Sequence, residues 1–283
     1  MKRVIIIIEK LEKIDRRVIF ALILIVVIIP IIHPIGMNVM VSPPVQKIYD
    51  FVNKLPEGSL IWVGFDYYNT TRTECDAQVI AFIRQAFSRN HKIFVTSTIP
   101  DGHTISQQIM DRLAKEYGKI YGKDYVILGY KPGSSVLILQ VCQDLRGIYN
   151  TDAFGTPLGD IPMMKDVKNY KDINMVFTAA DNQSFDNYAQ IANTQYGLPV
   201  AGGSTAVMVP WLYVFYNSGQ VLGILGGLKG AAEYEELIGK KETATAGMDA
   251  QSFVHVLIAL MILISNIAYF LKKAANKRFA GDK

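Results

Sequence analysis

The chain has 283 residues, half of them hydrophobic and 19% charged, with a formal net charge of +4. Residues 1–17 and 272–283 together hold eleven basic and four acidic residues, a net charge of +7, which leaves −3 for residues 18–271. This net acidic central region has no basic stripe, and nucleic-acid binding relies on clustered Lys and Arg. Nucleic acid is therefore excluded as the expected partner.

The first predicted element is a membrane-spanning helix over residues 18–36, which contain no charged residue. A span needs ~20 apolar residues, and the basic, amphipathic tail 1–17 precedes this one on its cytoplasmic side. A cleaved signal peptide is the alternative, but no small-x-small cleavage site follows. Pro30 and Pro34 are expected to distort the outer end without ending the span, because spanning helices tolerate proline. The sequence favours an uncleaved anchor.

Residues 40–240 follow as one domain in which short apolar runs alternate with helical patterns. Strands that are apolar on both faces and are separated by helices indicate a parallel sheet covered on both sides. The expected fold class is therefore α/β, a Rossmann-like three-layer sandwich with a mainly parallel sheet of about five strands. The predicted strands are 59–65, 92–97, 125–130, 173–179 and 198–203. The predicted helices are 45–55, 74–88, 105–121, 133–145 and 184–196.

Residues 143–172 interrupt this alternation with several glycines and prolines and no periodicity. Loops of this length within compact domains are often functional, and we expect a solvated or partner-facing loop. Its acidic residues Asp144, Asp152, Asp160 and Asp166 lack the spacing of a calcium-binding EF-hand loop. No metal site is predicted.

Residues 187–228 contain no charged residue. A third span over 205–228 is the alternative here, but the polar stretch 217–220 interrupts it. We instead expect a strand and two helices that pack in the core or against neighbouring copies of the chain. A glycine-rich helix over 219–238 would present small residues for close helix packing in a homo-oligomer. These residues are Gly219, Gly223, Gly226, Gly227 and Gly230.

The last predicted element is a second membrane-spanning helix over residues 253–271, again without a charged residue. Lys and Arg next to spans are held on the cytoplasmic side. The N-terminal tail and the tail 272–283 then both lie in the cytoplasm, and the domain 40–240 is extracytoplasmic, with the lipid bilayer as a partner. Lys240 and Lys241 lie on the wrong side of the second span for this rule.

The chain has two cysteines, Cys75 and Cys142. An oxidising exterior would allow one disulfide between them. We expect two small buried side chains instead.

Polar residues follow every predicted strand at its carboxyl end, which is where open parallel sheets bind ligands. The segments 131–135 (KPGSS) and 202–205 (GGST) have the composition of anion-binding turns, in which glycine lets the backbone approach a phosphate or carboxylate. Neither has the spacing of a Walker A loop or a dinucleotide fingerprint, so no cofactor is predicted. The alternative is that these residues are helix caps and turns. The predicted ligand site comprises Asp66, Asn69, Ser97, Thr98, Lys131, Gly133, Ser134, Asp181, Asn182, Gly202, Gly203, Ser204 and Thr205.

Asp66, Lys131 and Asp181 are the candidate catalytic residues, and their spatial arrangement decides whether they form one site. No nucleophile elbow is present, and a Ser–Lys dyad would pair Lys131 with Ser134 or Ser204. The main hypothesis is a doubly anchored extracytoplasmic binding or scaffold module that self-associates and binds a small anionic ligand. The alternative is a membrane-tethered hydrolase or transferase that acts on a phosphorylated or carboxylated small molecule.

Overall fold

The computed structural model describes the backbone of residues 15–281 and the side chains of residues 15–274. Most of the predicted tail 1–17 and the end of the tail 272–283 lie outside the described residues. The chain divides into two compact units. One comprises the chain up to Met37 together with Thr245 onward, and the other is Asn38–Ala244.

The second unit contains six parallel strands in the order β3-β2-β1-β4-β5-β6. This arrangement confirms the α/β class and the parallel sheet, and it is consistent with a Rossmann-like fold. The strands are β1 (Leu60–Asp66), β2 (Lys92–Ser97), β3 (Tyr125–Tyr130), β4 (Met175–Ala180), β5 (Val200–Ser204) and β6 (Gly223–Gly226). The sixth strand lies within residues 219–238, for which a single helix was expected.

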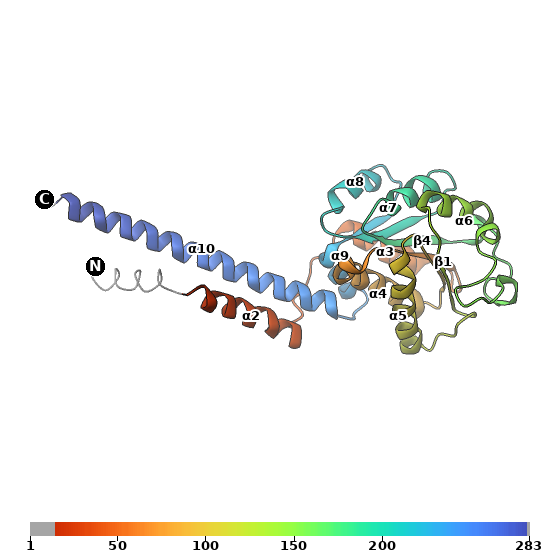
Figure 1. Ribbon diagram of the computed structural model, residues 1–283, viewed down its shortest axis with the longest axis horizontal. Helices are drawn as coiled ribbons and strands as arrows, with labels where there is room; N and C mark the ends of the chain where they lie inside the picture. Colours follow the sequence, from red (N-terminus) through yellow and green to blue (C-terminus); the bar gives the residue numbers. More distant parts are fainter. Residues whose placement is uncertain (1–14, 282–283) are drawn as a thin grey trace. The chain divides into compact units, whose positions relative to one another are not determined.

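Helices cover both faces of the sheet (Figure 1). Side chains alternate along β1, so Ile61, Val63 and Phe65 enter one core while Leu60 and Trp62 enter the other. The first core is covered by α3 (Pro43–Lys54), α4 (Arg72–Ser88), α5 (Pro100–Tyr117) and α9 (Gly227–Leu237). The second is covered by α6 (Ser134–Ile148), α7 (Ser184–Asn187) with the π-helical turn Tyr188–Asn193, and α8 (Val209–Asn217).

The five glycines predicted to form one helical packing face are spread over a turn, a strand and a helix, so that prediction is wrong. Gly219 has φ +79° in the turn after α8, Gly223 and Gly226 lie in β6, and Gly227 and Gly230 begin α9. A Cβ at Gly223 would lie 2.0 Å from the carbonyl oxygen of Pro44. Gly223, Gly226, Gly227 and Gly230 therefore allow close packing inside this domain, whereas a Cβ at Gly219 would meet no atom within 4 Å.

The irregular segment 143–172 is not the solvated loop that was expected. Seven of its apolar side chains are buried in the second core: Leu145, Tyr149, Leu158, Ile161, Met163, Met164 and Val167. Two short 3-10 turns, Leu158–Asp160 and Tyr170–Asp172, organise its backbone. Methionine and aliphatic side chains without a regular period still bury apolar surface, which a periodicity argument does not detect.

The two terminal helices, α2 (Arg16–Ile32) and α10 (Thr243–Gly281), belong to the other unit apart from the first two residues of α10. Among the described residues, one helix is long and apolar enough to cross a membrane, Thr243–Ala274 within α10. The 17 residues of α2 extend only about 25 Å, against a hydrocarbon core of ~30 Å. The first predicted span, 18–36, is therefore wrong, because the helix ends at Ile32. His33 leaves the helical conformation, as expected for a residue before proline.

Candidate functional site at the carboxyl ends of the strands

The strand order reverses between β1 and β4, which pair at the centre of the sheet. The chain leaves β1 towards α4 on one face and leaves β4 towards α7 on the other. Open α/β sheets bind ligands at such a switch point, outside the carboxyl ends of the strands. The loops after β1, β2, β3 and β4 meet here.

Asp66, the last residue of β1, has a fully buried side chain. Its Oδ1 accepts hydrogen bonds from the backbone N of Thr98 (2.7 Å) and from Thr98 Oγ1 (2.8 Å). Its Oδ2 accepts from Thr178 Oγ1 at 2.9 Å. Burial raises the pKa of Asp66 above its ordinary value of 3.8 despite these donors. Gly64 makes room for the carboxylate, because a Cβ there would lie 2.4 Å from Asp66 Oδ2.

A chain of hydroxyl groups connects this buried carboxylate to Ser134 at the start of α6. Asn187 Nδ2 donates to Ser134 Oγ (3.0 Å), and Ser134 Oγ donates to Ser184 Oγ (3.1 Å). Ser184 Oγ lies 2.9 Å from Thr98 Oγ1. The Thr98 hydroxyl gives its proton to Asp66, so Ser184 is the donor to Thr98. Every hydroxyl proton in the chain therefore points from Ser134 towards Asp66.

The first turn of α6 lies open to solvent beside the Ser134 hydroxyl. Gly133, with φ +86°, is the N-cap and supplies no side-chain hydrogen bond. The amides of Ser134, Ser135 and Val136 donate to no other residue in the described part of the chain, as is usual for the first turn of a helix. Ser135 and Val136 are exposed. An oxyanion bound next to Ser134 would find backbone donors there.

The predicted residues Asp181 and Asn182 join the loops after β1 and β4. Asp181 Oδ2 accepts from the backbone N of Tyr68 (3.0 Å) and from Thr71 Oγ1 (2.7 Å). Asn182 Nδ2 donates to the carbonyl oxygen of Asp66 (2.6 Å) and to Asp181 Oδ1 (3.0 Å). Asp181 is thus fully engaged in holding the two loops together.

Other predicted ligand residues serve as structural supports. Ser97 Oγ lies 2.6 Å from the carbonyl oxygens of Phe65 and Ile99, and Ser204 Oγ donates to the carbonyl oxygen of Ala180 at 2.6 Å. Their hydroxyls bind backbone within the sheet layer.

The remaining predicted residues of the GGST turn, and Asn69, do not face an open site. Gly202 and Gly203 are buried in β5, where a Cβ would lie 2.2 Å from backbone or side-chain oxygen atoms, and Thr205 is also buried. The backbone N of Asn69 donates to Asp101 Oδ2 at 3.0 Å, which fixes the loop after β1.

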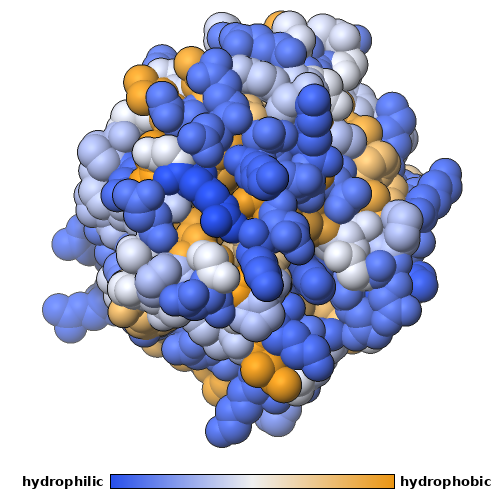
Figure 2. Space-filling model, turned by 90° about the vertical axis from the view of Figure 1, so that its right-hand side faces the viewer, coloured by the Kyte–Doolittle hydropathy of each residue, from blue (hydrophilic) through white to orange (hydrophobic). Residues whose placement is uncertain are grey.

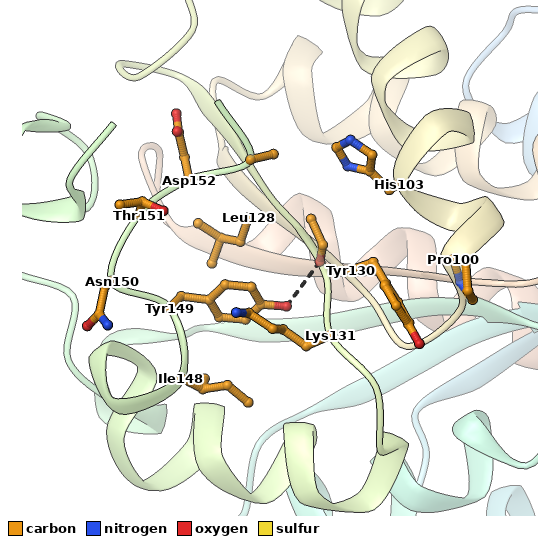
Figure 3. A pocket seen from close by; sticks show the side chains of 12 residues that line it. Pro100, His103, Leu128, Tyr130, Lys131, Ile148, Tyr149, Asn150, Thr151 and Asp152 are labelled. Atoms are coloured by element: carbon orange, nitrogen blue, oxygen red, sulfur yellow. Dashed lines mark hydrogen bonds between the residues drawn. The ribbon is translucent and has the colours of Figure 1, made fainter. Parts of the chain in front are cut away.

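Lys131 lies in a pocket of about 470 Å³ beside the edge strand β3 (Figure 3). Its Nζ is 5.7 Å from the centre of the Tyr149 ring. Among the described residues, no hydrogen bond or ion pair joins Lys131 to Asp66, Asp181, Ser134 or Ser204. The three candidate catalytic residues are therefore not joined to one another through Lys131, and no Ser–Lys hydrogen bond is formed among the described residues. The predicted site divides into the hydroxyl chain and the Lys131 pocket.

Ser184 and Asn187 are site residues that the sequence analysis did not identify. Both lie in α7, four and seven residues after the end of β4. The signal was available, because Ser184 was recognised as the start of a helix. Asp181 and Asn182, the predicted ligand residues of this loop, directly follow the strand, whereas Ser184 and Asn187 lie further along the chain.

No family model matches this chain, and no curated protein matches it either. Among solved structures, the chain is similar to the crystallised C-terminal domain of a glycosyl transferase group 1 family protein (LpcC) from Francisella tularensis. The sequences are 15% identical, and the match covers 76% of this chain and 91% of the other, with a TM-score of 0.31. This low similarity carries no inference about the reaction.

Proposed function

We propose that the α/β domain is a membrane-attached hydrolase or transferase that acts on a phosphorylated or carboxylated small molecule, with Ser134 as its nucleophile. The observation that carries this proposal is the directional hydroxyl chain from Ser134 to Asp66. A serine hydroxyl is a weak nucleophile unless a base removes its proton. A buried carboxylate with a raised pKa is such a base, and it is connected to Ser134 by hydrogen bonds.

The reaction begins when Ser134 Oγ forms a bond to the acyl carbon or phosphorus atom of the substrate. The Ser134 proton moves to Ser184, the Ser184 proton to Thr98, and the Thr98 proton to Asp66, which becomes a neutral carboxylic acid. The bond to the leaving group breaks, and the proton returns along the same chain to the leaving oxygen. Attack by water on the group held by Ser134 gives a hydrolase, and attack by a second hydroxyl compound gives a transferase.

Two structural features support this chemistry. Burial disfavours the charged form of Asp66, so protonation of Asp66 during the reaction relieves a desolvation cost. The amides of Ser135 and Val136, next in sequence to the nucleophile, are placed to donate to the oxygen that gains negative charge in the transition state.

Labelling with a fluorophosphonate tests the proposal, because this probe phosphonylates an activated serine and releases fluoride. We expect one adduct, on Ser134, when the detergent-solubilised protein is labelled and digested and its peptides are analysed by mass spectrometry. Ser134→Ala should abolish the adduct. Ser135→Ala is the matched control, because the neighbouring serine is exposed and makes no side-chain contact with the chain of hydroxyls. Absence of an adduct on Ser134 in the wild-type protein would contradict the proposal.

A second candidate function is a binding or scaffold module without catalysis, which self-associates. It is favoured by the contacts of Asp181, a candidate catalytic residue whose carboxylate holds the loops after β1 and β4 together. This candidate predicts that no serine is labelled and that light scattering finds a mass larger than that of one chain.

The proposal also includes attachment to the membrane through α10. Thr243–Ala274 is long and apolar enough to span, and Lys272, Lys273, Lys277 and Arg278 follow its apolar part. A basic cluster at this end favours a cytoplasmic C-terminus. The α/β domain would then lie on the extracytoplasmic side.

A further inference from the structure

The pocket beside β3 is lined by residues that do not belong to the hydroxyl chain. It is bounded by the end of β3, by the first turn of α5 and by the segment that follows α6. Its volume of about 470 Å³ lies in the range of small-molecule sites. The size fits a small metabolite.

The charged groups at this pocket leave one cation unpaired. Lys131 is exposed and forms no ion pair with any carboxylate in the described part of the chain. The carboxylate of Asp152 is already occupied, because it accepts from the backbone N of Phe154 (2.9 Å), the backbone N of Thr156 (2.8 Å) and Tyr121 Oη (2.8 Å). In Figure 3 this carboxylate points away from Lys131.

The other lining groups combine an aromatic wall with hydrogen-bonding side chains. The Tyr149 hydroxyl donates to the carbonyl oxygen of Gly129 at 3.0 Å, which fixes the ring beside Lys131 (Figure 3). His103 Nδ1 is buried and has no hydrogen-bond partner among the described residues, and the side chains of Asn150 and Thr151 are exposed at the pocket. A buried polar atom without a partner is unusual in a folded protein. The pocket thus offers the positive charge of Lys131 and several other polar side chains.

The pocket is also close in sequence to the proposed nucleophile. Lys131 and Ser134 are three residues apart, so their Cα atoms are separated by at most about 11 Å. This separation is short enough for one small molecule to span.

We infer that this pocket binds the anionic end of the molecule on which Ser134 acts, a small hydroxylated carboxylate or phosphate monoester whose charge is neutralised by Lys131. The assignment of the ligand as a substrate rests on the proposed function, whereas anion binding in the pocket does not. Asn150, Thr151 and His103 would bind the hydroxyl groups of such a ligand.

Protection of Ser134 against fluorophosphonate tests this inference. Gluconate and glucose 6-phosphate serve as the carboxylate and phosphate probes, and uncharged glucose is the control. At least one anion should slow labelling of the full-length protein in detergent, and glucose should not. Lys131→Ala should weaken the protection about tenfold, the factor expected for losing a charged hydrogen bond. Lys131→Arg should retain most of it, and Lys123→Ala is the matched control, because Lys123 is exposed outside the pocket lining.

Direct titration of both anions into the Ser134→Ala protein separates the two proposals. Binding that is lost in the Ser134→Ala, Lys131→Ala double variant supports the pocket assignment even if Ser134 is never labelled, in which case the proposed function fails alone. If Ser134 is labelled but neither anion protects or binds, the pocket assignment is overturned and the proposed nucleophile stands.

Discussion

At the scale of single residues, Asp66 is the group on which the proposed chemistry depends. It is fully buried, accepts hydrogen bonds from two threonines, and has a raised pKa because burial disfavours its charge. When Asp66 is ionised, its buried charge lowers the stability of the folded protein. The folded protein binds the Asp66 proton more tightly than the unfolded chain does. Asp66 therefore adds stability fully below its ordinary pKa of 3.8, and this contribution is lost as the pH rises through the folded pKa.

This pKa predicts the pH dependence of Ser134 labelling. Asp66 must be ionised to accept a proton, so the labelling rate should rise with pH through a midpoint above 3.8 and then level off. Asp66→Asn cannot accept the proton and should react slowly at every pH, by the factor of ~10²–10⁴ typical of a lost general base. Labelling reactions that are stopped at fixed times and quantified by mass spectrometry give the rate against pH for the wild-type and Asp66→Asn proteins. Identical profiles for the two proteins would show that Asp66 is not the base.

At the scale of elements, the sequence predicted most of the sheet, because its central strands are apolar on both faces. The predicted runs 92–97 and 125–130 coincide with β2 and β3. The prediction failed at β6, where glycines were interpreted as a helical packing face. Glycine fits at positions 223 and 226 because α3 and α8 approach the edge of the sheet too closely there for a larger residue. Only the tertiary contacts with Pro44 and Val209 distinguish glycines in a closely packed strand from glycines on a helical packing face.

A substitution in β6 tests this packing explanation. In Gly223→Ala the new Cβ would lie 2.0 Å from the carbonyl oxygen of Pro44 and 2.6 Å from Ile48 Cγ1. Overpacking of this kind costs about 1–3 kcal/mol, so Tm should fall. Gly159→Ala is the control, because the nearest atom to its Cβ would be Arg146 Nη1 at 4.0 Å. Equal Tm values for both variants, measured by differential scanning fluorimetry in detergent, would contradict the explanation.

The sequence could predict where in the fold the candidate site lies, but not which of the residues there face the open edge. The rule that ligands bind at the carboxyl ends of parallel strands selected Asp66, Thr98 and Ser134, which the structure connects by hydrogen bonds through Ser184. It could not separate residues that face the open edge from those that support it, since Ser97 and Ser204 have the same local sequence character but donate to backbone carbonyls. Hydrogen-bond direction depends on the neighbouring strand, and the strand order is not encoded in any local pattern.

At the scale of the whole molecule, the α/β domain presents a mainly hydrophilic surface on the face seen in Figure 2, with apolar side chains in small patches. Extended apolar exposure is instead found along α10, for example at Val256, Leu263 and Phe270. Exposed apolar side chains on all sides of a long helix are typical of a membrane span. This contrast supports a water-exposed domain carried by a membrane helix.

A single engineered cysteine tests the proposed orientation. Cys75 and Cys142 are buried, and burial raises the pKa of the Cys142 thiol to about 12, so neither should react with a maleimide in the folded protein. Lys123→Cys places an exposed thiol on the α/β domain. It should react with a membrane-impermeant maleimide in intact cells. Reaction only after lysis would place the domain in the cytoplasm.

The most direct test of the central claim is the rate of Ser134 labelling in Thr98→Val. Valine has nearly the shape of threonine and keeps the backbone hydrogen bond to Asp66, but it removes the hydroxyl that connects Ser184 to the carboxylate. If the hydroxyl chain activates Ser134, labelling should slow by at least about 100-fold, while the loss of two buried hydrogen bonds lowers Tm without unfolding the protein. An unchanged labelling rate in a folded Thr98→Val protein would contradict the account.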